Sequence, residues 1–319
     1  KKVCHVNLGL AGDSLFLNKV MKEALFVNGI HVNALCTERP EIMNEELQKI
    51  EFLTDDFDEM LEKVDAVYIR TLPSNHYEHI SKALKRGKHV LCESPIALSK
   101  QETQMLFNLA SSKKLILMEA IKTAYSTAFA RMLLLVKSGK IGDVLSVDSV
   151  CTSLKTCEKA NSVEWNGIFE WGPTALLPIF QILGTDYKDY RIISQFRDKE
   201  CRQDAFTKME FIYEHAVASI KVGDGVKSEG ELIISGTKGY IYVPAPWWKT
   251  DYFEIRYENS NENRRYFYQL DGEGIRYELV AFARAIETGK DMASIDTAIT
   301  YEIADVIGSF KNQRNMIII

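Results

Sequence analysis

The sequence of 319 residues lacks the features that mark several protein classes. Its six cysteines form no C-x-x-C pair, and no histidines accompany them at the spacing of a metal site. Its lysines and arginines form no cluster, and the formal net charge is −5. Nucleic acids and anionic membranes attract a concentrated basic surface, so we expect neither as a partner.

Long apolar runs are also absent, because none approaches the roughly 18 residues that a membrane helix needs. The chain enters a candidate strand without a charged and apolar leader, and three of the six cysteines, Cys4, Cys36 and Cys92, lie within apolar runs. We therefore expect a cytoplasmic, soluble protein with reduced thiols, no metal site and no internal repeat.

The first third of the chain alternates short apolar runs with amphipathic helical segments. With 46% apolar and 26% charged residues, the composition is that of a globular protein, and the length favours two domains. Continuous apolar strands separated by helices are typical of a parallel sheet covered on both faces, here a doubly wound one. The predicted strands are Val3–Leu8, His31–Cys36, Asp65–Arg70, His89–Cys92 and Leu115–Met118.

After about residue 125 the hydrophobic pattern changes to a period of two. Segments such as Val144–Val150 and Phe206–Tyr213 alternate and are joined by hairpin-length turns, which indicates a mostly antiparallel sheet. We predict an α/β Rossmann domain at residues 1–120 and an α+β domain with a large, mostly antiparallel open sheet at residues 121–319.

A glycine-containing segment follows the first predicted strand, where a dinucleotide-binding fingerprint belongs. In G-x-G-x-x-G, the glycines provide a tight turn, close approach to the pyrophosphate and helix packing. Gly9 and Gly12 supply the second and third glycines, and Asn7 replaces the first. The segment from Gly9 through Leu10 and Ala11 to Gly12 is thus a candidate cofactor-binding turn.

The end of the second predicted strand bears on which dinucleotide would bind. An acidic residue there contacts the adenosine ribose in many NAD-binding folds, but this sequence has Thr37, followed by Arg39. A guanidinium can pair with a 2′-phosphate, which favours NADP over NAD. The alternative is that Arg39 is a solvated loop residue.

Two later stretches resemble the Gfo/Idh/MocA family of NAD(P)-dependent oxidoreductases. They are Ala66-Val-Tyr-Ile-Arg-Thr-Leu-Pro-Ser-Asn-His76 and Ala83-Leu-Lys-Arg-Gly-Lys-His-Val-Leu-Cys-Glu-Ser-Pro95. Further segments, among them Gly274-Ile-Arg-Tyr-Glu278, resemble its dihydrodiol and D-xylose dehydrogenase branch. The resemblance implies a Rossmann domain, a second domain whose open sheet forms a dimer or higher oligomer, and a sugar-like or diol substrate.

The resemblance also implies roles for single residues. Besides the glycines at the pyrophosphate, it places Glu93 beside the nicotinamide ribose and predicts a cis peptide bond at Ser94–Pro95. The residues expected to line the nicotinamide side are Thr71, Pro73, Asn75 and His76.

The sequence departs from the family where protons are transferred. Ser94 replaces the family lysine, Thr174 stands at the histidine or tyrosine position, and Leu177 replaces an aspartate. Serine and threonine hydroxyls titrate too high to act as unaided bases. Lys122 and Tyr125 are the candidates to compensate, although a solvated lysine and a packed tyrosine are the ordinary alternatives.

Two hypotheses follow. The first is an active oxidoreductase in which Lys122, Tyr125 or water replaces the lost groups. The second is a non-catalytic relative that binds a nucleotide or ligand, or serves assembly. Four tryptophans are candidates to wall a ligand cleft or to pack in the core or dimer interface: Trp165, Trp171, Trp247 and Trp248.

Overall fold

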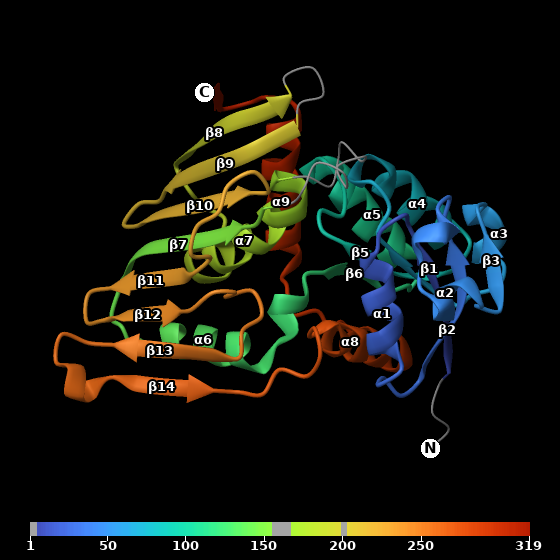
Figure 1. Cartoon of the computed structure of the whole chain (residues 1–319), viewed down its shortest axis with the longest axis horizontal. Coiled ribbons are helices and arrows are strands. Elements are labelled where there is room, and N and C mark those ends of the chain that lie inside the picture. Colours follow the sequence, from blue (N-terminus) through green and yellow to red (C-terminus); the bar gives the residue numbers. More distant parts are fainter. Residues whose placement is uncertain (1–4, 155–166, 199–202) are drawn as a thin grey trace. The chain divides into compact units, whose positions relative to one another are not determined.

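The structure is a computed structural model that describes residues 5–154, 167–198 and 203–319, and it forms two compact units (Figure 1). The first unit comprises Lys1–Lys122 together with Asp271–Asp296, and the second comprises Thr123–Leu270 and Thr297–Ile319. The first unit ends two residues beyond the predicted boundary at residue 120. It also includes a late segment that the sequence assigned to the second domain.

A six-stranded parallel sheet forms the centre of the first unit. Its order is β3-β2-β1-β4-β5-β6, which is the doubly wound order and confirms the predicted Rossmann fold. The strand order reverses between β1 and β4, and ligands of such folds bind at the carboxyl edge there. The strands are β1 (Val6–Ala11), β2 (Ile30–Cys36), β3 (Phe52–Thr54), β4 (Ala66–Ile69), β5 (His89–Glu93) and β6 (Leu117–Ala120).

The helices of this unit begin at side chains that satisfy their first backbone N–H groups. Asn44, Asp56 and Ser99 accept hydrogen bonds at the starts of α2, α3 and α5. Buried strand residues and inward helix faces form a core cluster that includes Val67, Ile80 and Val90. The helices are α1 (Phe16–Ala24), η1 (Pro40–Ile42), α2 (Glu45–Gln48), α3 (Phe57–Leu61), α4 (Pro73–Lys85), α5 (Lys100–Ser112) and α8 (Ile275–Thr288).

Helix α8 belongs to this unit because it packs against α1. The contact includes a two-pronged ion pair: Arg276 Nε donates to Glu23 Oε2 at 2.9 Å, and Arg276 Nη2 donates to Glu23 Oε1 at 3.0 Å. The guanidinium also covers the Phe26 ring, 4.2 Å from its centroid. Glu23 is buried, so this ion pair fixes the late segment to the first unit.

A nine-stranded sheet dominates the second unit. Its order is β14-β13-β12-β11-β7-β10-β9-β8-β15. Strands β10 and β7 pair in parallel, as do β15 and β8, and the other neighbours are antiparallel. The mostly antiparallel sheet predicted from the period-two pattern is thereby confirmed. The strands are β7 (Val144–Thr152), β8 (Asp189–Asp198), β9 (Gln203–Ile212), β10 (Val217–Gly223), β11 (Leu232–Gly236), β12 (Tyr240–Val243), β13 (Tyr252–Arg256), β14 (Arg264–Phe267) and β15 (Met316–Ile318).

Helices of the second unit cover the sheet, with α7 against β7 and β10 and α9 beside α7 (Figure 1). Helix α7 starts after Gly167, and the buried carboxylate of Asp204 accepts the Ile168 N–H through both oxygens, at 3.2 and 3.0 Å. The elements are η2 (Lys122–Tyr125), α6 (Thr127–Lys137), α7 (Ile168–Leu183), η4 (Ser260–Glu262) and α9 (Thr297–Lys311). No helix among the described residues is long and apolar enough to cross a membrane.

Three cysteines of the described chain are buried and unpaired: Cys36, Cys92 and Cys151. Cys4, Cys157, Cys201 and Trp165 lie outside the described residues. Trp247 is fully buried and donates its indole N–H to the Val150 carbonyl at 3.0 Å, so it is a core residue. Trp171 and Trp248 contact each other with ring centroids 4.9 Å apart.

Candidate nucleotide-binding and active site

The predicted glycine turn is shorter than the sequence suggests, because β1 continues to Ala11. Asn7 lies inside this strand and not in a turn, with its backbone N–H bonded to Asp65. Gly9 also lies in the strand, where a Cβ would stand 2.9 Å from Met60 Sδ. Gly9 therefore provides room for helix α3, and its approach to a pyrophosphate stays a prediction.

Gly12 is the residue of the motif that forms the turn. Its φ of +142° is one that side chains disfavour, and a Cβ would stand 2.2 Å from the Arg70 carbonyl oxygen. Its N–H donates to the Cys36 carbonyl at 3.0 Å, which ties the turn to the end of β2. Leu10 and Ala11, also predicted to contact the cofactor, are fully buried strand residues.

At the end of β2 the structure supplies a carboxylate that the sequence analysis did not place there. Asp13, directly after Gly12, accepts the Thr37 hydroxyl at 2.7 Å and the Glu38 N–H at 2.8 Å. Arg39 is exposed, and its Nε donates to Glu41 at 3.2 Å. Thr37 is buried and also accepts the Arg39 backbone N–H.

Helix α4 contains three of the residues predicted to line the nicotinamide side. It begins at Pro73, so Pro73, Asn75 and His76 lie in its first turn, with Asn75 exposed. The ring of His76 is fully buried, with Nδ1 2.7 Å from the Pro95 carbonyl oxygen and Nε2 2.9 Å from the Thr71 carbonyl oxygen.

Burial lowers the pKa of His76 to about 4, so the ring is neutral at pH 7. A neutral imidazole has a single N–H, which donates to one of these two carbonyls. Both ring nitrogens are thus turned to the backbone, and His76 connects the start of α4 with the segment after β5. The Ser94–Pro95 peptide bond in that segment is cis, as predicted.

A network of ionisable side chains occupies the carboxyl edge of the sheet around β4 and β5. Tyr68 donates its hydroxyl to Glu93 Oε1, and Arg70 Nη1 lies 3.4 Å from Glu93 Oε2. Arg70 Nε donates to Ser14 Oγ at 3.0 Å, and its guanidinium lies 4.4 Å from the centroid of the Phe16 ring. Burial, followed by the charge of Glu93, raises the pKa of Tyr68 well above its usual value, so the phenol keeps its proton.

The network extends to Glu278 of α8 and to Lys122. Glu278 is buried, and its Oε2 has no hydrogen-bond partner among the described residues. Burial and then the charge of Glu93 raise the pKa of Glu278, while Lys122 and Arg70 act against this rise. Lys122 Nζ lies 3.3 Å from Glu273 Oε2. The edge of the first unit thus gathers carboxyl, phenol, guanidinium and ammonium groups.

Ser94 faces away from exposed space. It is buried, and its hydroxyl donates to Glu119 Oε1 at 2.9 Å. Two other predicted proton-transfer residues, Tyr125 and Thr174, belong to the second unit, where each is half-buried. Of the predicted site residues, Lys122, Glu93 and Gly12 lie in the first unit, and position 94 of this unit carries no amine.

Sequence reasoning missed four members of this site: Asp13, Tyr68, Arg70 and Glu278. Two signals were present. Asp13 follows the predicted glycine turn directly, and Arg70 is a charged residue that ends a continuous apolar strand. Ligands of parallel-sheet folds bind at the carboxyl edge of the sheet, so polar residues there can contact them.

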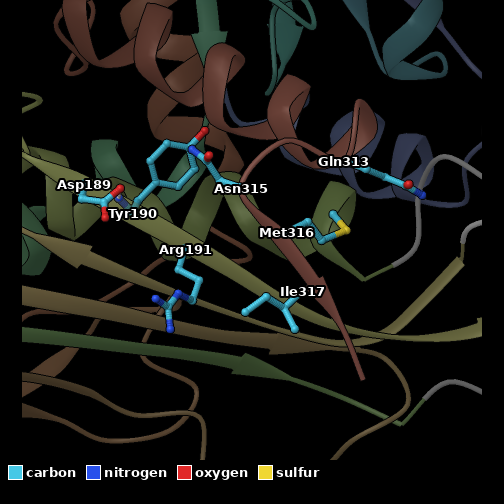
Figure 2. A pocket seen from close by; sticks show the side chains of 7 residues that line it. All are labelled: Asp189, Tyr190, Arg191, Gln313, Asn315, Met316 and Ile317. Atoms are coloured by element: carbon cyan, nitrogen blue, oxygen red, sulfur yellow. Dashed lines mark hydrogen bonds between the residues drawn. The ribbon is translucent and has the colours of Figure 1, made fainter.

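A pocket of about 400 Å³ lies elsewhere, in the second unit (Figure 2). Strand β8, strand β15 and the turn before β15 line it with Asp189, Tyr190, Arg191, Gln313, Asn315, Met316 and Ile317. Tyr190 donates its hydroxyl to Ser309 at 2.7 Å. None of the predicted site residues lines this pocket, and among the described residues no group of His, Cys, Asp and Glu could hold a metal ion.

Residues 13–121 match the family described as "Oxidoreductase family, NAD-binding Rossmann fold". The model that matches is the one of the Gfo/Idh/MocA family, and it covers about a third of the chain. The chain is 26% identical over 256 residues to trans-1,2-dihydrobenzene-1,2-diol dehydrogenase of Oryctolagus cuniculus, covering 76% of this chain and 77% of that protein.

Other relatives match over shorter stretches. D-xylose 1-dehydrogenase (NADP(+)) of Hypocrea jecorina is 38% identical over 81 residues, which are 25% of this chain and 21% of that enzyme. The more identical curated relatives are thus matched over less than a third of their lengths. A 3-ketoreductase from Actinomadura kijaniata, solved with NADP and TDP-benzene, shares the fold with a TM-score of 0.84 at 16% identity, over 99% of both chains.

Proposed function

We propose that this protein is an NAD(P)-dependent oxidoreductase that interconverts a hydroxyl and a carbonyl group on a sugar-like or cyclic diol substrate. The observation that carries the proposal is the network of Arg70, Glu93, Tyr68 and Glu278 at the carboxyl edge of a Rossmann sheet. Relatives named as diol and xylose dehydrogenases support the substrate class.

The first unit has features that fit a dinucleotide. Gly12 lets the turn pack directly against the Arg70 backbone, and Ser14 and Arg70 lie beside the start of α1, where a pyrophosphate binds in this fold. When bound, the nicotinamide would supply or accept the hydride.

The chain's own residues have separate tasks in this proposal. Arg70 and Tyr68 hold the carboxylate of Glu93 in one orientation, and Glu93 would accept a ribose hydroxyl. Lys122 is the amine of this unit that we assign to the substrate oxygen, where its ammonium would offset developing alkoxide charge. Glu273 would position Lys122 through their 3.3 Å contact.

Turnover tests the proposal. We would mix the protein with NAD⁺ or NADP⁺ and a panel of aldoses, inositols and cyclic diols, and follow formation of the reduced nicotinamide. Lys122→Met should lower kcat by about 10²-fold with cofactor affinity unchanged. Lys49→Met, at an exposed pair with Glu45, is the matched control. Absence of turnover with every substrate, together with unchanged Tm at saturating cofactor, would contradict the proposal.

A second candidate is a nucleotide-binding protein that does not catalyse turnover. One observation favours it: Ser94 stands buried at the lysine position and is bonded to Glu119. A Tm raised by NAD⁺ or NADP⁺, without turnover of any substrate in the panel, would decide for this candidate.

We also propose a homodimer or larger homo-oligomer in a reducing compartment such as the cytoplasm. Strands of the second sheet expose apolar side chains, including Leu145, Ile212, Val217 and Phe267, and such surfaces are typical of interfaces. The unpaired buried thiols agree with a reducing compartment. Light scattering coupled to size-exclusion chromatography tests the oligomer, and a monomeric mass would refute it.

A further inference from the structure

The carboxylate of Asp13 lies at the carboxyl end of β2 although it comes from the β1–α1 turn. Its Oδ1 accepts the Thr37 hydroxyl at 2.7 Å and the Glu38 N–H at 2.8 Å. The Gly12 N–H bonds the Cys36 carbonyl at 3.0 Å, so the turn is fixed to the strand end from both sides. In Rossmann folds that bind NAD, an acidic residue near this strand end contacts the adenosine ribose.

The second oxygen of this carboxylate is available to a ligand. Asp13 is exposed, and Oδ2 receives no hydrogen bond from the described residues. A carboxylate oxygen readily accepts a hydrogen bond from a hydroxyl group. A phosphate monoester carries up to two negative charges, so a carboxylate repels it. A ribose with a free 2′-hydroxyl therefore suits this position, and a 2′-phosphate does not.

The charged side chains near Asp13 at the end of β2 are also negative. Burial raises the pKa of the Cys36 thiol to about 12, and the carboxylates of Asp13, Asp56, Asp55 and Glu38 add to that rise in this order. The cation that could offset them, Arg39, donates its Nε to Glu41 at 3.2 Å. Thr37 has both its hydroxyl donor and an acceptor position in use, which leaves it little capacity for a phosphate.

We propose that Asp13 is the residue that selects the dinucleotide, favouring NAD(H) and disfavouring the 2′-phosphate of NADP(H). The inference rests on the proposed function, since it assigns a specificity to the same cofactor site. The acidic residue that the sequence lacks at position 37 is thus supplied by the residue after the glycine turn. Arg39, from which the sequence favoured NADP, is directed to Glu41 instead.

The test compares the affinities of NADH and NADPH by the fluorescence of the reduced nicotinamide, with the full chain. For the wild type we expect NADH to bind at least about tenfold more tightly, from repulsion between charges a few ångströms apart. Asp13→Asn keeps an oxygen that can accept from Thr37 and Glu38 but removes the charge. It should lower the ratio of the two Kd values by at least about tenfold, mainly through tighter NADPH binding.

The matched control is Asp55→Asn, which removes an exposed charge of the same sign near Cys36 without touching Thr37. It should change the ratio by less than about threefold, because solvent and salt screen a charge that does not contact the 2′-phosphate directly. Thermal unfolding by circular dichroism confirms that each variant is folded.

Three results would overturn the inference. The first is tighter binding of NADPH than of NADH by the wild type. The second is a ratio that Asp13→Asn leaves unchanged in a folded protein. Both leave the proposed oxidoreductase intact if either cofactor binds and supports turnover. The third, no binding of either dinucleotide by the wild type or the variant, refutes this inference and the proposed function together.

Discussion

Replacing Glu23 with glutamine removes the charge of the ion pair between α1 and α8 while nearly preserving its shape. In the wild type, Arg276 donates through Nε and Nη2 to the two carboxylate oxygens at 2.9 and 3.0 Å, and its backbone N–H lies 3.3 Å from Oε2. The side chain of Glu23 is 7% exposed and that of Arg276 is 20% exposed. The guanidinium would therefore be left largely desolvated, facing an amide.

The expected loss of stability depends on the interactions that Arg276 keeps in the variant. Removing one partner of a buried ion pair costs about 3–5 kcal/mol. Glutamine still offers one acceptor to Arg276, and the guanidinium keeps its contact with Phe26 and some water. We therefore expect the free energy of unfolding of the first unit to fall by about 2–3 kcal/mol. At about 2–4 °C per kcal/mol, its Tm should fall by about 4–12 °C.

Two measurements check this. Urea unfolding followed by circular dichroism gives the stability, and hydrogen exchange shows whether residues 271–296 open more often. The control is Glu45→Gln, whose exposed pair with Lys49 should contribute less than about 0.5 kcal/mol. If Glu23→Gln costs no more than this control, or if exchange at residues 271–296 is unchanged, the ion pair does not hold α8 in the first unit.

The same variant has a pH signature. Burial raises the pKa of Glu23, but the hydrogen bonds and charge of Arg276 outweigh this effect and leave the pKa below its usual value. A lowered carboxyl pKa contributes stability above the unfolded-state pKa of about 4.3, and this stability is lost as the pH falls through the folded pKa. The gap between wild type and Glu23→Gln should therefore close in acid.

Three more predictions concern the site. Burial lowers the pKa of His76 from 6.5 to about 4. The wild type should therefore lose about 3 kcal/mol of its free energy of unfolding as the pH falls from 6.5 to about 4. Urea titrations should show that this loss is absent in His76→Gln. Gly12→Ala should cost about 3 kcal/mol or more, because its Cβ meets the Arg70 carbonyl; Gly139→Ala, with nothing within 4 Å, should cost only about 1 kcal/mol. Ser94→Lys should raise turnover about 10²-fold beside Glu119, and an unchanged rate in a folded variant that binds cofactor would refute the argument from the missing lysine.

The periodic parts of the fold were predictable, and the short or irregular parts were not. Helix α8 (Ile275–Thr288) can be recognised from the sequence, because its apolar face repeats through four turns. Strand β3 has three residues and exposes Leu53, so it leaves no alternating pattern to detect. The sequence likewise carries no sign that the segment before β3 is divided into η1 and the short α2, where Asn44 caps a new start.

The candidate site was predictable in its location but not in its side-chain partners. The glycine spacing predicted a turn after the first strand, and the family resemblance implied Glu93, which is the last residue of β5. The contact of Asp13 with Thr37 joins residues 24 positions apart, and a single sequence carries no sign of it. Glu278 comes to the site only because α8 returns to the first unit, which the predicted boundary at residue 120 did not foresee.

The charged side chains around β4 and β5 argue against the hypothesis that the site lost its catalytic function when Ser94 replaced the family lysine. Burying Glu278 with an oxygen that has no partner among the described residues costs stability, as does holding Arg70 and Glu93 out of water. An apolar replacement at these positions would be neutral or stabilising. Burial and the charge of Glu93 raise the pKa of Glu278, and a carboxyl with a raised pKa holds its proton to higher pH than an ordinary one, which suits it to donate a hydrogen bond. The network therefore favours a site that binds a ligand and transfers protons. Ser94 is hydrogen-bonded to Glu119, so in this interpretation neighbouring residues transfer the protons in its place.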